Sequence, residues 1–403
     1  MSYTNKISLI KDTIDNNDID KLINWLKKYP RLTKGKLTKE FESKWSSYIG
    51  CKYSIFVNSG SSANLAMLYA VRLISEKKGN FSKNKRIIIP AVSWATDLAP
   101  VIQLGFDPYL CEASKETLGV DINHFEKLCK EGRCKFAMIV HVLGIPCQMK
   151  EIRKICDTYG VILLEDSCES VGSEIEGIKT GNFGLMSSFS FYFGHHCSTI
   201  EGGMICTNDK EIYELLKMIR SHGWDRDLDK ETQKNLRTQY NITDFEALYT
   251  FYIPGFNIRS TDLQAFIGIN QIDKLDSNNQ KRQNNYSIYQ KNIINNYWKL
   301  PNQNNFISNF AYPIIHPNRN KLVEVLSEND IECRPLICGS MSRQPFYLNL
   351  KKEPWKLEYN KKSLLFSETI HNYGLYLPNH PYLEQDDIVR ISNIVNSVIG
   401  GLK

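Results

Sequence analysis

The stretch Tyr53-Ser54-Ile55-Phe56-Val57-Asn58-Ser59-Gly60-Ser61-Ser62-Ala63-Asn64 decides the fold class. Its first residues are aromatic or β-branched, its middle is small and polar, and a helix-like run follows it. This order of strand, turn and helix recurs, because β-rich runs at 86–90, 136–143 and 161–166 alternate with helix-like stretches at 62–76 and 150–159. Such alternation is typical of βαβ units on a mostly parallel, buried sheet. We therefore predict an α/β fold.

Two domains, or one large domain with an appendage, are expected from 403 residues, because one domain typically takes about 100 to 200. Further β-rich pieces at 187–193 and 204–207 precede a helix-like run, so we assign residues 1–275, with an N-terminal arm, to the large domain. Residues 277–305 are rich in Asn, Gln, Lys and Tyr, which predicts a long exposed helix and a loop without chemistry. The remainder alternates β-like pieces (311–315, 331–336) with a helix-like one (319–329). Residues 276–403 are thus predicted to form a smaller α+β domain.

Composition excludes several classes of protein. Hydrophobic residues at 42% and charged residues at 23% are globular averages, and the net charge of +6 is spread along the chain without a basic stripe. Nucleic acid is therefore not an expected partner. We find neither an apolar run long enough to span a membrane nor a signal-peptide pattern, so the expected compartment is the cytoplasm. The eleven cysteines form no CxxC or CxC pair, which argues against disulfides, zinc and an iron-sulfur cluster.

The loop at Gly60 and Ser61 is the first candidate site. It follows a strand and opens a helix, so its backbone N–H groups could bind a phosphate. A serine-rich turn that merely caps an ordinary helix would show the same residues.

The run Leu163-Leu164-Glu165-Asp166-Ser167-Cys168-Glu169-Ser170 is the second candidate site. Here an apolar strand ends in acidic residues, at the sheet edge where open α/β folds usually build their sites. Asp166 could pair with a protonated heterocycle, or it could cap a helix or lie on the surface.

The third candidate is the segment 188–203, in which His195 and His196 follow an aromatic β-rich run and precede the turn at Gly202 and Gly203. Because neighbouring strand residues face opposite sides, one histidine is expected to face the site. It could act as a general acid or base. No third ligand lies at a metal-motif spacing, so no metal is expected, and an inert, hydrogen-bonded histidine pair is the other interpretation.

In this order and spacing the three segments resemble the sugar aminotransferase family named after DegT, DnrJ, EryC1 and StrS. The resemblance covers nearly the whole chain and extends to other motifs: Thr33-Lys34-Gly35, Phe41-Glu42, Pro90-Ala91-Val92-Ser93-Trp94, Gly144-Ile145-Pro146, Gly181-Asn182-Phe183-Gly184, Ser221-His222-Gly223-Trp224 and Gly255-Phe256-Asn257-Ile258-Arg259. It implies the type I fold of enzymes that use pyridoxal phosphate (PLP). It also implies a homodimer whose active sites use residues of both subunits.

The resemblance also implies roles for single residues. Gly60, Ser61 and Ser190 would bind the cofactor phosphate, and Trp94 would stack on the pyridine ring. Asp166 would pair with the ring nitrogen and keep it protonated, so that the ring can accept electrons. Asn257 would reach the phosphate bound by the neighbouring subunit.

One departure from the family pattern bears on the function. Aminotransferases of the family carry a lysine six residues before the glutamate of the Glu-Gly-Gly turn, and this lysine holds PLP covalently. Six residues before Glu201 this chain has His195, which cannot form that link. The same substitution marks the family's sugar 3-dehydratases, which use pyridoxamine phosphate (PMP).

This branch removes the C3 hydroxyl of a nucleotide-linked 4-keto-6-deoxyhexose. Because the chain has no CxC, it resembles the members that need neither an iron-sulfur cluster nor a reductase. Its expected substrate is GDP-4-keto-6-deoxy-D-mannose, with L-glutamate as amine donor, in synthesis of the 3,6-dideoxysugar colitose for lipopolysaccharide O-antigen. The resemblance implies that His195, with an unperturbed pKa of about 6.5, moves the proton that lets the hydroxyl leave.

Other residues are assigned more broadly. Glu169, beside the cofactor, and His222 are expected to line the site, while Arg259 and Arg334 would bind nucleotide phosphates or the carboxylates of glutamate. Surface salt bridges are the alternative for both arginines. Two rival functions remain, namely an ordinary nucleotide-sugar aminotransferase and a non-catalytic protein that binds PLP or a nucleotide sugar. Lys210 and Lys217 are poor substitutes for the missing lysine, because they are expected on the helix after the turn.

Overall fold

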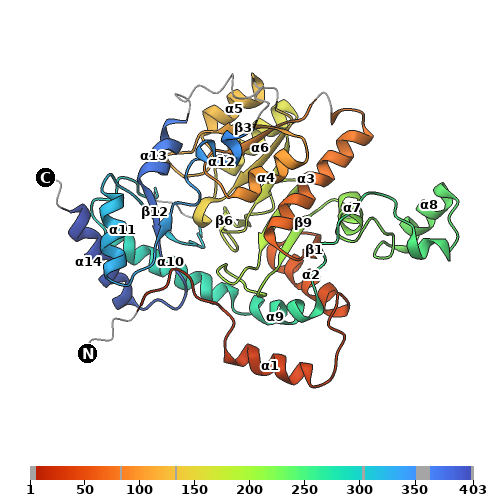
Figure 1. The fold of residues 1–403 in the computed structure, drawn as a ribbon, viewed down its shortest axis with the longest axis horizontal. Coiled ribbons are helices and arrows are strands. Elements are labelled where there is room, and N and C mark those ends of the chain that lie inside the picture. The colour runs from red at the N-terminus through yellow and green to blue at the C-terminus, as the bar shows by residue number, and fades with distance from the viewer. Residues whose placement is uncertain (1–5, 82–83, 132–133, 302–304, 351–363, 401–403) are drawn as a thin grey trace.

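The computed structural model describes residues 6–81, 84–131, 134–301, 305–350 and 364–400. Figure 1 shows a large sheet covered by helices and, beside it, a second and smaller sheet with its own helices. The described termini both lie next to the smaller unit, and one helical segment projects away from the opposite side.

The large sheet has seven strands in the order β1-β9-β8-β5-β4-β2-β3. Strands β2, β3, β4, β5 and β8 run parallel to one another, whereas β9 runs antiparallel to both β8 and β1. Asp166 at the end of β5 lies between Val140 of β4 and Ser188 of β8. The bounds are β1 Tyr53–Val57, β2 Arg86–Pro90, β3 Asp107–Cys111, β4 Phe136–Val140, β5 Ile162–Asp166, β8 Met186–Ser190 and β9 Gly203–Thr207; β6 Glu174–Ile175 and β7 Ile178–Lys179 form a separate hairpin.

Helices cover both faces of this sheet. The helix bounds are α1 Asn16–Leu26, α2 Lys36–Ile49, α3 Gly60–Lys77, α4 Ala95–Gln103, α5 Ile122–Lys130, α6 Met149–Tyr159, α7 Lys210–Arg220, α8 Lys230–Tyr240, α9 Asp262–Ile272, α10 Leu275–Asn292, α11 Arg319–Glu328, α12 Pro345–Leu348, α13 Leu365–Tyr373 and α14 Gln385–Ile399, with short 3₁₀ turns η2 Val142–Gly144, η3 Glu246–Tyr249 and η4 Met341–Arg343. Within the parts of the chain listed above, no helix is long and apolar enough to cross a membrane.

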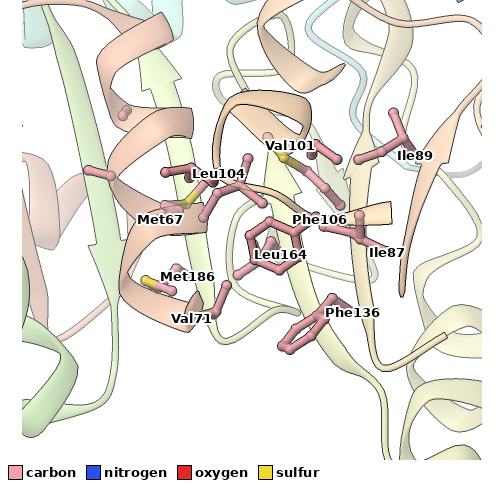
Figure 2. Close-up of a cluster of buried hydrophobic side chains, with 14 of the residues drawn as sticks. Met67, Val71, Ile87, Ile89, Val101, Leu104, Phe106, Phe136, Leu164 and Met186 are labelled. Carbon is pink, nitrogen blue, oxygen red and sulfur yellow. The ribbon is translucent and has the colours of Figure 1, made fainter. Parts of the chain in front are cut away.

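The main core lies between the sheet and α3, α4 and α7. Figure 2 shows Met67 and Val71 of α3 beside Leu164 and Met186 of the sheet, together with the aromatic pair Phe106 and Phe136. Alternate strand residues point the other way, so that Ile88, Ala137 and Leu163 pack with α5 and α6. Because most strand residues on both faces are apolar and buried, the acidic and aromatic site residues are expected at the strand ends.

The smaller sheet has the order β10-β12-β11, with β10 Tyr312–Ile315, β12 Gly374–Leu377 and β11 Arg334–Pro335. It packs with α10, α11 and α14 around a separate apolar cluster. Ile7, near the start of the chain, belongs to this cluster and forms a bridge with Ile331. The predicted division of the chain between residues 275 and 276 coincides with the start of α10 and stays a prediction.

The predicted α/β class is confirmed, and β1 and β2 have the predicted bounds. Three local predictions were wrong. The β-rich run 187–193 leaves the sheet at Ser190, and of 331–336 only Arg334 and Pro335 form a strand. Helix α10 is not an exposed helix, because one side of it is buried against the rest of the protein.

Candidate active site

The carboxyl ends of the parallel strands collect the acidic and aromatic residues. Trp94 follows β2 as the N-cap of α4, and Asp166 is the last residue of β5. The Trp94 side chain is 55% exposed although it follows a strand whose last four residues are buried, so its ring face is available to a ligand. This edge is where open α/β sheets bind their ligands.

Asp166 lies in a buried network with a second carboxyl group. The amide nitrogen of Asn64 donates to Asp166 Oδ2 at 2.7 Å and to Asp97 Oδ1 at 3.1 Å. Asp166 also accepts the Cys168 N–H at 2.9 Å, and Asp97 accepts the Trp94 N–H at 2.9 Å. Burial, and then the charge of Asp166, raise the pKa of Asp97 well above its usual value. The raised pKa favours the protonated form of Asp97.

The predicted phosphate loop forms a close cradle at the start of α3. A Cβ atom on Gly60 would lie 2.7 Å from Ser190 Cβ, and one on Gly203 would lie 2.3 Å from the Ser59 carbonyl carbon. Only glycine fits at these two contacts. The cradle holds the first-turn N–H groups of Gly60 and Ser61, which have no acceptor within the helix, next to the Ser190 hydroxyl.

His195 lies beyond the end of β8, in a turn, so the expectation based on alternating strand faces does not apply to it. Its Nδ1 is 2.9 Å from the Cys168 carbonyl oxygen. Because a carbonyl can only accept, Nδ1 carries the proton, and Nε2 of the neutral ring is the proton acceptor. Burial lowers the pKa of His195 to about 4, opposed by the Cys168 carbonyl and by Asp166. The half-buried His195 is thus a neutral base beside Asp166.

His196 faces away from this edge. It is 1% exposed, and its Nε2 donates to the Ser308 carbonyl at 3.0 Å. Burial lowers its pKa well below the usual value, and Arg282 lowers it further. Of the two histidines, His195 is therefore the one placed for chemistry.

Glu169 is half-buried and accepts the Leu143 N–H at 2.8 Å through Oε2. Burial raises its pKa to about 8, which the Leu143 N–H opposes and the Asp166 charge reinforces. Near neutral pH the group is thus mostly protonated. The protonated form can donate a proton, and the ionised form can accept one.

The smaller sheet closes the other side of this site. Tyr376 of β12 pairs with Arg334 of β11, and burial raises the Tyr376 pKa, reinforced by Glu169 and opposed by Arg334. The Arg334 side chain is exposed and donates within the protein only to the neighbouring Cys333 carbonyl, at 2.8 Å, among the described contacts. Its remaining guanidinium N–H groups are available to an anion.

Three of the predicted residues form a separate group. Arg259 donates to Asn257 Oδ1 at 3.0 Å, and the Asn58 N–H donates to the Ile258 carbonyl beside the phosphate loop. The half-buried His222, at a φ of +62°, packs edge-on against Trp224. The described contacts of this group run to the loop around residue 256 rather than to Asp166 or His195, and the roles of its members stay predictions.

Lys210 and Lys217 lie on α7, as predicted, and they pair with Asp229 and Glu214. Among the residues the structure describes, no group of three or more His, Cys, Asp or Glu side chains could hold a metal ion.

The arrangement fits PLP or PMP on its own geometry. A cradle of N–H groups beside a hydroxyl suits a phosphate, an exposed indole face suits a flat ring, and the buried carboxyl group of Asp166 suits a protonated ring nitrogen. The sequence analysis missed Asn64, Asp97, Phe310 and Arg282. Only Asp97 had a local signal, because it stands three residues after Trp94, where a capping box places an acid.

Comparison with known proteins agrees with this geometry. A model of the DegT/DnrJ/EryC1/StrS aminotransferase family matches residues 13–396. The GDP-4-keto-6-deoxy-D-mannose 3-dehydratase of Yersinia pseudotuberculosis is 33% identical over 370 residues, which cover 90% of this chain and 91% of that protein. The enzyme of the same name from Escherichia coli O55:H7 is 35% identical over 373 residues, with coverages of 88% and 91%.

A solved structure of a 3-dehydratase is also similar to this chain. GDP-4-keto-6-deoxymannose-3-dehydratase with a trapped PLP-glutamate geminal diamine superposes with a TM-score of 0.84 at 30% identity, covering 96% of this chain and 100% of that one.

Proposed function

The chain belongs to the DegT/DnrJ/EryC1/StrS aminotransferase family, and on that premise we propose that it is a PLP/PMP-dependent nucleotide-sugar 3-dehydratase. It removes the C3 hydroxyl of GDP-4-keto-6-deoxy-D-mannose, with L-glutamate as amine donor, in 3,6-dideoxysugar synthesis. The similarity to two 3-dehydratases, each covering about nine tenths of both chains, supports this activity over the transamination that is common in the family.

The observation that carries the proposal is the side chain at position 195. This is the position at which the family resemblance places the lysine that holds PLP. In this chain the side chain at position 195 is an imidazole, held by its hydrogen bond to the Cys168 carbonyl and subject to the charge of Asp166. Such a group cannot hold PLP covalently, but it can accept and return a proton.

We assign the cofactor contacts as follows. Gly60 and Ser61 bind the phosphate through their N–H groups, and Ser190 binds it through its hydroxyl. Trp94 covers the ring, and Asp166 holds the ring nitrogen protonated. Asn64 and the Cys168 N–H orient the Asp166 carboxylate for this task.

When bound, the cofactor supplies an amine that condenses with the C4 ketone of the sugar and a ring that withdraws electrons while the C3–oxygen bond breaks. His195 Nε2 accepts a proton from carbon. It then passes this proton to the departing C3 hydroxyl, which leaves as water. Glu169, mostly protonated near neutral pH, lines the site and can donate a hydrogen bond there. Overall, glutamate is oxidised to 2-oxoglutarate and ammonia while the sugar loses one oxygen, so no external reductase is needed.

Arg334 and Arg259 are proposed to bind anionic groups, namely the nucleotide phosphates or the carboxylates of glutamate, and His222 to line the sugar side. Arg334 is exposed, and Arg259 and His222 are half-buried, so a ligand can reach all three side chains. We further propose a homodimer with shared active sites. The projecting segment that contains α8 (Figure 1) exposes large apolar side chains, which favours burial against a second copy: Tyr240, Phe245, Leu248, Tyr249 and Phe251. The cytoplasmic location stays a prediction.

The experiment that tests this function is mass spectrometry of the sugar product. The purified protein is incubated with PLP, L-glutamate and GDP-4-keto-6-deoxy-D-mannose, without a reductase. A product lighter by one oxygen, formed together with one equivalent each of ammonia and 2-oxoglutarate, is expected.

Two other outcomes contradict the proposal in different ways. A product with nitrogen at C4 indicates an aminotransferase. Unchanged sugar and no 2-oxoglutarate, although PLP binds, indicate a protein that binds without catalysis.

A further inference from the structure

Arg282 of α10 is a buried cation without an acidic partner. It is 2% exposed, and its Nη1 donates to two neutral acceptors, the carbonyl oxygens of Phe310 at 3.1 Å and Asn379 at 3.0 Å. In the described part of the chain no carboxylate pairs with it, and its Nε has no partner. Burial lowers the pKa of Arg282 to about 10, which still leaves it charged near neutral pH. Burying an unpaired charge costs free energy of folding, so we expect a functional reason for the position of Arg282.

Phe310 connects this cation to the histidines. Its N–H donates to the Leu143 carbonyl at 2.9 Å and its carbonyl accepts from Arg282, so the backbone is held from both sides. The guanidinium carbon of Arg282 lies 5.9 Å from the centre of the Phe310 ring. The same ring is 5.3 Å from that of His195 and 5.9 Å from that of His196. Arg282 therefore fixes the surface against which His195 rests.

The charges around His195 oppose one another. Asp166 of β5 favours the protonated imidazole, as does the Cys168 carbonyl that follows that strand. Burial favours the neutral ring most strongly, and Arg282 on α10 adds a smaller influence in the same direction. In its own turn the neighbours are the neutral ring of Tyr192, at 6.4 Å, and His196, whose own pKa is lowered well below the usual value. Among the described groups that act on His195, Arg282 is thus the cation that offsets Asp166.

We propose that Arg282 is a positioning residue for His195: it holds Phe310 against the imidazole and, as an unpaired buried cation, disfavours a second positive charge on that ring, so that Nε2 stays free to accept a proton. The value of this arrangement for catalysis rests on the proposed function. The arrangement itself does not, because it involves only side chains of this chain.

The test is an NMR titration of the His195 ring in protein labelled at histidine, without cofactor or sugar. The resonance is identified by its loss in His195→Gln. Arg282→Gln keeps an amide donor for the two carbonyls but removes the charge. We expect this variant to raise the titration midpoint of His195 by about one pH unit, the usual scale for the loss of a nearby like charge.

Arg319→Met is the matched control. Arg319 donates to the His371 carbonyl on the smaller unit, so the variant removes one positive charge away from His195 and should leave the midpoint unchanged. Arg282→Lys keeps a cation and is the second variant, which also serves if Arg282→Gln fails to fold. Its midpoint should stay close to that of the parent protein.

An unchanged midpoint in Arg282→Gln, or a full one-unit rise in Arg282→Lys, overturns the proposal. In the loaded enzyme, Arg282→Gln should move the acidic limb of the kcat profile to higher pH and lower kcat without raising KM for the sugar. Because the titration needs neither cofactor nor substrate, it can succeed even if the proposed reaction is wrong, so the two failures are distinguishable.

Discussion

The imidazole Nδ1 of His195 lies 2.9 Å from the carbonyl oxygen of Cys168, two residues after the end of the strand that carries Asp166. One short segment therefore orients both the proposed base and the proposed partner of the ring nitrogen. The contact also fixes the tautomer, because only Nδ1–H can donate to a carbonyl, and this leaves Nε2 as the acceptor.

Replacing His195 with Gln should lower the rate of deoxygenation by about 10²- to 10⁴-fold, the usual contribution of a general acid or base. Glutamine can donate to Cys168 but cannot accept a proton from carbon. Binding of PLP, followed by its absorbance, should persist. His196→Gln is the control, because its amide can still donate to Ser308, and it should change turnover little. Equal losses in the two variants would contradict the assignment.

The two buried carboxyl groups should respond differently to amide substitution. Asp166→Asn removes the negative charge and should weaken PLP binding by about 10- to 100-fold, the value of a hydrogen bond to a charged group. Asp97→Asn replaces a group that is already neutral, so it should change PLP affinity less than about threefold, well below the cost of a lost charged bond. Absorbance titrations of both variants measure this difference, and a reversed order would show that the charge lies on Asp97.

The sequence predicted which residues lie at the carboxyl edge of the sheet, because the order of residues along a strand determines which of them stand at its end. An apolar strand that ends in Asp166 and a strand that leads into Gly60 must place those residues at the carboxyl edge, whatever the details of packing. The strand β3 was missed because it contains Pro108 and begins with Asp107, residues that are depleted in strands but tolerated at a sheet edge, where β3 lies.

Glu169 should make the stability of the protein depend on pH. Its pKa is 4.5 when unfolded and about 8 when folded, so between these values the folded state binds a proton that the unfolded state releases. The free energy of unfolding therefore falls as the pH rises from the unfolded-state pKa of Glu169 to its folded-state pKa. Glu169→Gln removes this pH dependence. The advantage of the variant over the parent in free energy of unfolding should therefore grow by roughly 2 to 5 kcal/mol from pH 4.5 to pH 9.

Urea unfolding at both pH values measures this gain. The exposed Glu328, replaced by Gln, is the control and should show no such gain. A Glu169→Gln protein whose advantage over the parent is the same at both pH values would contradict the raised pKa.

Adding a methyl group at the phosphate loop should weaken cofactor binding without unfolding the protein. In Gly60→Ala the new Cβ would lie 2.7 Å from Ser190 Cβ, so the loop or Ser190 has to move away from the phosphate position. We expect PLP affinity to fall at least about tenfold, the cost of losing one or two charge-assisted bonds. Calorimetry with PLP, beside a melting curve to confirm folding, measures this, and unchanged affinity would place the phosphate elsewhere.

The residues that sequence reasoning missed come from distant segments. Phe310 reaches His195 only because residues 307–310 pack on η2, where the Phe310 N–H bonds to the Leu143 carbonyl. Arg282 was taken for part of an exposed helix, since Asn, Gln and Lys surround it in the sequence. Nothing local marks the turn of α10 on which its guanidinium becomes buried, because the acceptors that hold it are carbonyls 28 and 97 residues away.

The most direct test of the central claim compares the parent protein with His195→Lys by mass spectrometry of the sugar formed from GDP-4-keto-6-deoxy-D-mannose with PLP and L-glutamate. Lysine restores a group that can hold PLP covalently and removes the imidazole. A product one oxygen lighter is expected from the parent protein and none from the variant, which should return either unchanged sugar or an amino sugar. Undiminished deoxygenation by His195→Lys would contradict this expectation.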